Sequence, residues 1–116
     1  MQQLTVPIAK NSNNKSAFWA TKGAWKKQIL NDVWACVKEQ KIKPVTEYPI
    51  QLFFTFYFVG RLLDCDNCGG VMVKGIIDGL RYSKIITNDS PKQVEQIGIR
   101  VEKSKRKHDY CVVEID

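Results

Sequence analysis

The sequence lacks any segment long enough to cross a membrane as a helix. Its longest apolar stretch runs from Leu52 to Val59 and is interrupted by Thr55, whereas a spanning helix needs roughly 20 apolar residues. Residues Met1 to Pro7 contain neither a basic region nor an apolar core, so they do not resemble a secretory signal. We therefore expect a cytoplasmic protein with no membrane partner.

Histidine and cysteine are also scarce, which limits the metal centres that the chain could build from them. There is one histidine, His108, and there are four cysteines. Cys65 and Cys68 form a C-x-x-C pair, which is half of a zinc site, but no second ligand pair follows. Cys36 and Cys111 fall at positions typical of a core. We expect reduced thiols and no structural zinc.

Acidic residues are outnumbered by basic ones. The 116 residues include 18 Lys and Arg against 12 Asp and Glu, a net charge of +6 at pH 7. This excess favours polyanionic partners but does not distinguish nucleic acid from an acidic protein. With 44% hydrophobic residues and four prolines, the chain has the composition of a folded protein and the length of one domain. We expect residues 1–116 to form a single domain.

Hydrophobic periodicity predicts four strands and two helices. The strands are expected at Gln2–Pro7, Ile50–Val59, Val94–Lys103 and Asp109–Ile115, and the helices at Lys22–Lys41 and in the second half of Leu62–Leu80. Polar or proline-containing stretches at Lys10–Ser16, Lys41–Pro49 and Ile86–Pro91 are expected to be connections, with Ser104–His108 as a hairpin loop between the last two strands. The order β-α-β-α-β-β predicts an α+β fold in which two helices pack on a small mixed sheet.

The apolar positions of each element define its buried face. The first helix has Trp25, Ile29, Val33 and Val37 at every fourth position, widened by Leu30 and Trp34, and the second has Val73, Ile76, Ile77 and Leu80. Ile50, Leu52, Phe54, Phe56 and Phe58 share one face of a strand that we expect to be central, and Ile97, Ile99 and Val101 face inward from a later strand. Alternation of this kind is typical of strands that contribute one face to a core.

Two aspartates in the stretch LLDCDNCGGVMVKGIIDGL are the strongest chemical signal. Asp64 and Asp66 are separated by one residue, so in an extended segment their carboxylates project to the same side. Two such charges repel each other unless a cation lies between them, and hard oxygen ligands suit Mg²⁺ or Mn²⁺. Asp89, in a later connection, could supply a third ligand. A phosphodiester is the matching substrate.

A lysine follows the aspartate pair. Lys74 lies on the polar side of the second helix, four residues before Asp78, and a lysine beside a metal site can stabilise charge that develops on a phosphate. A simple helical ion pair with Asp78 would also explain it. Asn67 could cap the following turn, hold a metal-bound water or contact DNA.

The order of these residues resembles the RusA family of Holliday junction resolvases. D-x-D-N, then a K-x-x-x-D-G-L helix, then an acidic turn before Ser90 are similar to the family's motifs. The resemblance implies that Asp64, Asp66 and Asp89 bind Mg²⁺ and that Lys74 is essential for cleavage. It also implies a homodimer that nicks opposite strands of a four-way junction. This chain differs in its longer interval between Asp66 and Lys74, and in having Asn88 where the family has an acidic residue.

Basic side chains near these motifs are candidate DNA contacts. They comprise Lys15 in the N-terminal connection and Lys103, Lys105, Arg106 and Lys107 around the last loop. Such runs are often only solvated surface, but beside a nuclease site they would position DNA through its phosphates. Two alternatives stay open: a metal nuclease that prefers another branched structure, and a DNA-binding protein without catalysis.

Overall fold

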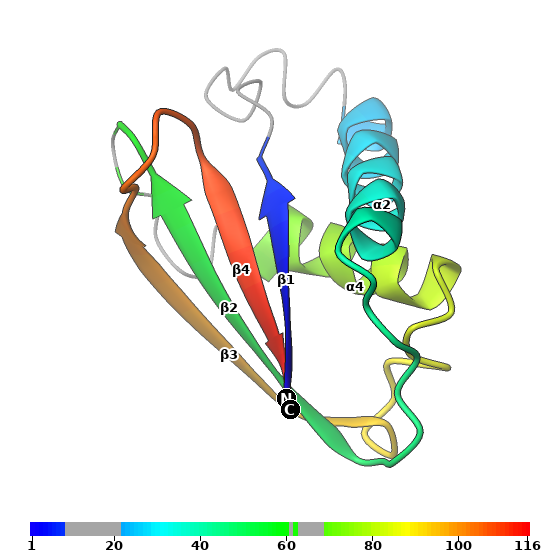
Figure 1. Cartoon of the computed structure of the whole chain (residues 1–116). Helices are drawn as coiled ribbons and strands as arrows, with labels where there is room; N and C mark the ends of the chain where they lie inside the picture. Colours follow the sequence, from blue (N-terminus) through cyan, green and yellow to red (C-terminus); the bar gives the residue numbers. More distant parts are fainter. Residues whose placement is uncertain (9–21, 61, 63–68) are drawn as a thin grey trace.

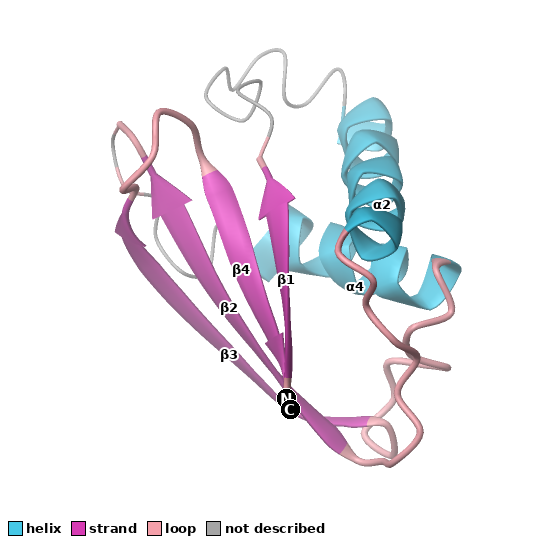
Figure 2. Ribbon diagram, in the orientation of Figure 1, coloured by secondary structure: helices cyan, strands magenta, loops and turns pink. Residues whose placement is uncertain are grey.

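The chain forms an α+β domain with both helices on one side of a mixed sheet (Figures 1 and 2). The computed structural model describes residues 1–8, 22–60, 62 and 69–116. The elements are β1 (Gln2–Pro7), α2 (Lys22–Glu39), β2 (Ile50–Phe58), the π-helical turn η2 (Gly69–Val73), α4 (Lys74–Tyr82), β3 (Val94–Lys103) and β4 (Tyr110–Ile115). The predicted class and element order are confirmed. No helix in the described part of the chain is long and apolar enough to span a membrane.

The sheet has four strands in the order β1-β4-β2-β3. Strand β2 pairs antiparallel with β4 and parallel with β3, while β1 pairs antiparallel with β4. A parallel pair needs a crossover connection, and the segment that contains η2 and α4 provides it. Strand β2 is therefore central, as its sequence predicts.

The predicted hairpin between the last two strands is wrong, because β2 lies between β3 and β4. Strand β2 has the most strongly apolar face, and a central place gives its backbone hydrogen-bond partners on both edges. The loop after β3 crosses the end of β2, where the Ser104 N–H donates to the Phe58 carbonyl at 2.9 Å. The turn residues at 104–108 predict that the chain reverses direction there. They do not predict which strand β4 pairs with.

The core lies between the helices and the helix-facing side of the sheet. The predicted face of β2 is buried, and so are Ile29, Val33 and Val37 of α2 and Val73, Ile76, Ile77 and Leu80. Cys36 and Cys111 are both buried, in agreement with their predicted core positions. Burial, and then the nearby charges of Asp32 and Glu39, raise the pKa of the Cys36 thiol.

Two apolar residues are less buried than their pattern predicts. Trp34 is 41% exposed, and its ring lies 3.9 Å from the ammonium group of Lys38, so it does not widen the buried stripe. Ile97 is 46% exposed because β3 is an edge strand, although it shares the core-facing side with its partner Leu52. The side chain of Trp25 lies outside the described part.

Helices α2 and α4 approach closely at two glycines. A Cβ atom added at Gly79 would lie 2.7 Å from the Val33 Cβ, and one at Gly75 would lie 3.1 Å from the Ile29 Cγ2. Both glycines are on α4, one helical turn apart, and allow the two backbones to pack together. This packing buries one side of α4 and leaves its polar side facing away from the core.

Candidate active site

Four charged side chains form a closed ring on the polar side of α4. Lys74 Nζ lies 4.0 Å from Asp78 Oδ1 and 3.9 Å from Asp89 Oδ2. Arg81 Nη1 lies 3.8 Å from the same Asp78 oxygen and 3.9 Å from the same Asp89 oxygen. Positive and negative groups therefore alternate around the ring. We call Lys74, Asp78, Arg81 and Asp89 the charge ring.

Helical spacing brings three of these residues together. Lys74 and Asp78 are four residues apart, and Asp78 and Arg81 are three apart, which are the spacings of neighbours on a helix surface. The opposite side of α4 is fixed by the buried residues of the core. The three side chains consequently project on the side of the helix that faces away from the sheet.

Asp89 reaches the ring because the connection after α4 folds back. Lys84 has a positive φ of 62°, and the buried Ile85 and Ile86 anchor the chain that follows. The Thr87 N–H donates to the Tyr48 hydroxyl at 3.2 Å. The Ser90 carbonyl accepts from the N–H groups of Gln93, which ends the next turn, and Val94, which begins β3. Asp89 is thereby held between two fixed points of the loop.

The contacts in the charge ring are electrostatic, and they leave a carboxylate oxygen of Asp89 accessible to a further ligand. Distances of 3.8–4.0 Å exceed those of hydrogen bonds. Both cations approach Oδ2 of Asp89, and no ion pair places a described residue at Oδ1. The side chain of Asp89 is 33% exposed, so its carboxylate is accessible to a further ligand. Exposed pairs of this kind contribute only about 0–1 kcal/mol to stability.

The structure brings together two of the residues that the sequence singles out. Lys74 and Asp89 come from different elements, and their proximity was expected from the proposed metal site and from the family resemblance. The predicted pairing of Lys74 with Asp78 is also present. Asp64, Asp66, Asn67 and Lys15 lie outside the described residues. Among the residues that are described, no three His, Cys, Asp or Glu side chains gather to hold a metal, so the metal-binding roles stay predictions.

The longer interval between Asp66 and Lys74 contains the π-helical turn η2. It occupies five residues, Gly69–Val73, and continues directly into α4. A π-helical turn is wider than an α-helical one and is frequent at functional sites. The π-helical turn therefore occupies part of the interval between Asp66 and Lys74 and ends where the regular helix begins, at Lys74.

The basic residues around the loop between β3 and β4 have different surroundings. Lys103 Nζ donates to the carbonyls of Val59 at 3.2 Å and Gly60 at 3.0 Å. Arg106 lies 4.5 Å above the ring of Tyr110. Lys105 and Lys107 are exposed, and no hydrogen bond or ion pair to another described residue engages either side chain. Their DNA contacts stay predictions, and the exposed side chains of Lys105 and Lys107 are the most accessible to phosphates.

Sequence reasoning missed Arg81 and Asp109. Arg81 follows Asp78 by three residues, and this helical spacing was a usable signal. Asp109 accepts a hydrogen bond from the Val59 N–H at 2.8 Å, and together with Lys103 it fixes the chain just before the D-x-D-N motif. No local pattern predicts that contact, because it depends on the loop crossing the end of β2.

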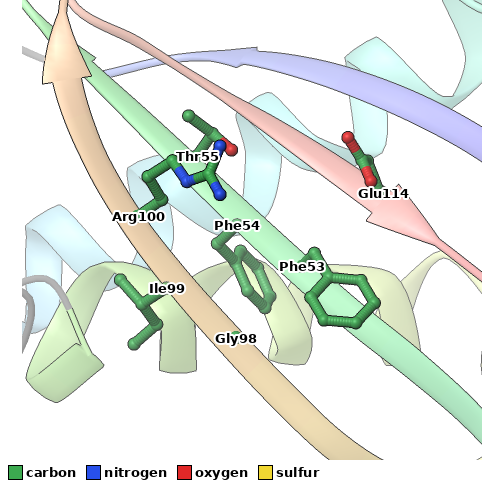
Figure 3. Close-up of a pocket in the computed structure, with 7 residues that line it drawn as sticks. All are labelled: Phe53, Phe54, Thr55, Gly98, Ile99, Arg100 and Glu114. Atoms are coloured by element: carbon green, nitrogen blue, oxygen red, sulfur yellow. The ribbon is translucent and has the colours of Figure 1, made fainter.

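A separate pocket of about 260 Å³ lies on the sheet. Figure 3 shows the residues that line it, on three neighbouring strands: Phe53, Phe54, Thr55, Gly98, Ile99, Arg100 and Glu114. Of the described residues that line it, Arg100 and Glu114 are charged. The pocket therefore offers one carboxylate and no member of the charge ring, so the ring is the stronger candidate for phosphodiester chemistry.

Comparison with known proteins found no match. No protein-family model matches the chain, and no curated protein matches it.

Proposed function

We propose that the chain is a Mg²⁺-dependent endodeoxyribonuclease that cuts branched DNA, with the Holliday junction as its substrate. The observation that supports this proposal is the 3.9 Å approach of Lys74 to Asp89. The resemblance to the RusA family requires these two residues to share one site, and nothing in their separate sequence contexts requires it. The remaining acidic residues of the proposed site are Asp64 and Asp66 of the D-x-D-N motif, which precedes Lys74.

The donor chemistry fits a magnesium ion. Asp89 offers a partly exposed carboxylate with one oxygen outside the charge ring, and Mg²⁺ commonly takes one or two carboxylates while keeping waters. Asp64 and Asp66 would complete the ligand set. A bound Mg²⁺, which Mn²⁺ can replace, would lower the pKa of an attacking water and polarise the scissile phosphate.

The side chains of this protein would position the DNA and balance its charge. Lys74 is more than half exposed, so its flexible ammonium group can turn from the ring toward a phosphate and stabilise charge in the transition state. Lys105 and Lys107 would contact the DNA backbone without reading its sequence. In the proposed homodimer, each subunit would cut one strand, so that the two nicks are symmetric.

A cleavage assay on matched substrates tests the proposal. A four-way junction and a linear duplex of the same sequence are incubated with the protein, with Mg²⁺ or with a chelator. We expect paired nicks in the junction, only with metal, and little cutting of the duplex. Asp64→Asn and Asp66→Asn are expected to abolish cleavage but to keep junction binding, because each removes a metal ligand and leaves the basic surface intact.

The alternatives give different results in the same assay. A nuclease with another preference would cut a flap or a fork faster than the four-way junction. A binding protein without catalysis would shift the junction in a gel but would leave it uncut in both Mg²⁺ and Mn²⁺. Either result would contradict the proposed function.

A further inference from the structure

The side of the sheet opposite the helices carries a stacked pair of tyrosines. Tyr57 of β2 and Tyr110 of β4 are partners in the sheet, and their ring centroids lie 4.6 Å apart with the planes 12° from parallel. The buried residues of β2 alternate with the row that contains Tyr57, so the two rings lie on the side away from the core. We call this side, which α2 and α4 leave uncovered, the open face (Figure 1).

Among the described residues, the stack ends at Tyr57. Its partner on the β4 side is Tyr110, but its partner on the β3 side is Glu102, whose side chain is exposed. Tyr57 itself is only half-buried. A flat group that lies over β3 would therefore extend the row of rings, in the offset-stacked arrangement that aromatic groups prefer.

Positive side chains surround the stacked pair. The guanidinium of Arg106 lies 4.5 Å above the ring of Tyr110, which brings the loop between β3 and β4 to the open face. Lys105 and Lys107 are its exposed neighbours in that loop. Arg100 is exposed on β3, and Figure 3 shows its guanidinium turned toward β2. These four cations suit a ligand that carries negative charge.

Two carboxylates on the open face limit what can bind beside them. Glu114 is the partner of Phe53, which lies roughly 13 Å along the strand from Tyr57. Glu102 lies directly beside Tyr57 and repels phosphates, but a carboxylate accepts hydrogen bonds from the amino group of a base such as cytosine. The ligand that fits both the ring and Glu102 is therefore a base, with its phosphates nearer the cations.

We infer that the open face binds an unpaired DNA base stacked on Tyr57, while Arg100, Lys105 and Lys107 hold the phosphates of the same strand. Aromatic rings beside a positively charged groove are the usual means of binding single strands. Burial, and then the charge of Glu102, raise the pKa of Tyr57, so its ring carries no negative charge that would repel a phosphate. The inference rests on the proposed function only in taking DNA as the partner, because a branch point where strands leave their duplex supplies such bases.

Binding of a short oligodeoxycytidine is the direct test, because a single strand offers its bases without a duplex. Fluorescence anisotropy of the labelled strand measures the affinity of the whole chain without divalent metal, so that no cleavage interferes. Tyr57→Leu removes the ring, and Tyr57→Phe keeps it. Trp34→Leu is the matched control, because it removes an exposed ring from α2, on the other side of the sheet. Circular dichroism confirms that each variant is folded.

We expect Tyr57→Leu to bind the oligodeoxycytidine about fivefold or more weakly than wild type, the loss that follows when one base loses its aromatic platform. Tyr57→Phe and Trp34→Leu should stay within about twofold of wild type. Arg100→Gln changes an exposed side chain and gives a second test that does not depend on Tyr57. It should reduce the slope of log binding constant against log salt concentration by about 0.7, the value for one phosphate contact in a single strand.

Two results would overturn the inference. One is a folded Tyr57→Leu protein that binds within about twofold of wild type, together with an unchanged salt slope for Arg100→Gln. The other is a Tyr57→Leu protein that keeps its affinity for the strand but changes its oligomeric state in sedimentation velocity. That result would assign the open face to a second copy of the chain.

Failure of the inference is distinguishable from failure of the proposed function. If wild type cleaves the four-way junction but does not bind the oligodeoxycytidine, the role of the open face is wrong and the nuclease proposal stands. If wild type binds the strand through Tyr57 but cleaves no branched DNA, the inference stands and the nuclease proposal is wrong. If it neither binds nor cleaves, both are wrong.

Discussion

Gly79 occupies the closest contact between α2 and α4, so replacing it by alanine tests how the site-bearing helix is held. The added Cβ would lie 2.7 Å from Val33 Cβ and 2.9 Å from its Cγ1. The Cβ of Val33 is fixed by its backbone and cannot move away by a rotamer change. The helices must therefore separate, and α4 would shift together with Lys74, Asp78 and Arg81.

The expected cost follows from two opposing effects. Alanine favours a helix over glycine by about 1 kcal/mol, whereas overpacking a close-packed core costs about 1–3 kcal/mol. At Gly79 two atoms of Val33 lie closer than 3.0 Å to the added Cβ, so the upper part of that cost applies. We expect Gly79→Ala to lower the free energy of unfolding by about 1–2 kcal/mol.

Gly75→Ala is the matched control, because its added Cβ would approach only to 3.1 Å, at the Ile29 Cγ2. A side-chain methyl group can give way by a few tenths of an ångström, so this variant should stay within about 0.5 kcal/mol of wild type. Urea unfolding followed by circular dichroism measures both variants. A Gly79→Ala protein as stable as wild type would refute the close packing of α2 against α4.

Three further predictions concern the basic loop and a buried thiol. Lys105→Gln combined with Lys107→Gln should reduce the slope of log binding constant against log salt concentration, for junction binding, by about 0.9 for each lost phosphate contact. An unchanged slope would indicate that the loop is a solvated turn without phosphate contacts. Lys103→Gln should instead lower stability in urea by about 0.5–1.5 kcal/mol, because Lys103 donates to two main-chain carbonyls; an unchanged midpoint would count against that role. Cys36 should react with iodoacetamide more slowly in the folded protein than in urea, since burial raises the pKa of its thiol. Peptide mass mapping at pH 8 measures the two reaction rates, and equal rates would contradict the prediction.

The strands and helices were predictable because the spacing of their apolar residues indicates which face of each element is buried. The alternating row from Ile50 to Phe58 identified the central strand, and the stripe of Val73, Ile76, Ile77 and Leu80 identified α4. Periodicity reports burial of a face but not the neighbour of a strand. The insertion of β2 between the last two strands was missed for that reason, and so was the exposure of Ile97 at the sheet edge.

The candidate site was predictable only in part. The pairing of Lys74 with Asp78 follows from helical spacing alone. The approach of Asp89 depends on the path of the chain after α4, including the Tyr48 contact that holds Thr87, and no local pattern specifies that path. Arg81 completes the ring only because that loop returns to the helix.

Single-turnover cleavage by Lys74→Ala tests the central claim most directly, because it separates chemistry from binding and product release. If Lys74 acts on the phosphate, its loss should lower the cleavage rate about 10²-fold or more while junction affinity stays nearly unchanged. Lys92→Ala is the matched control, because it removes an exposed positive charge outside the charge ring, and it should cleave at the wild-type rate. A Lys74→Ala rate within about twofold of wild type would contradict the account, since the lysine would then be only the helical partner of Asp78, a pair worth about 0.2–0.5 kcal/mol.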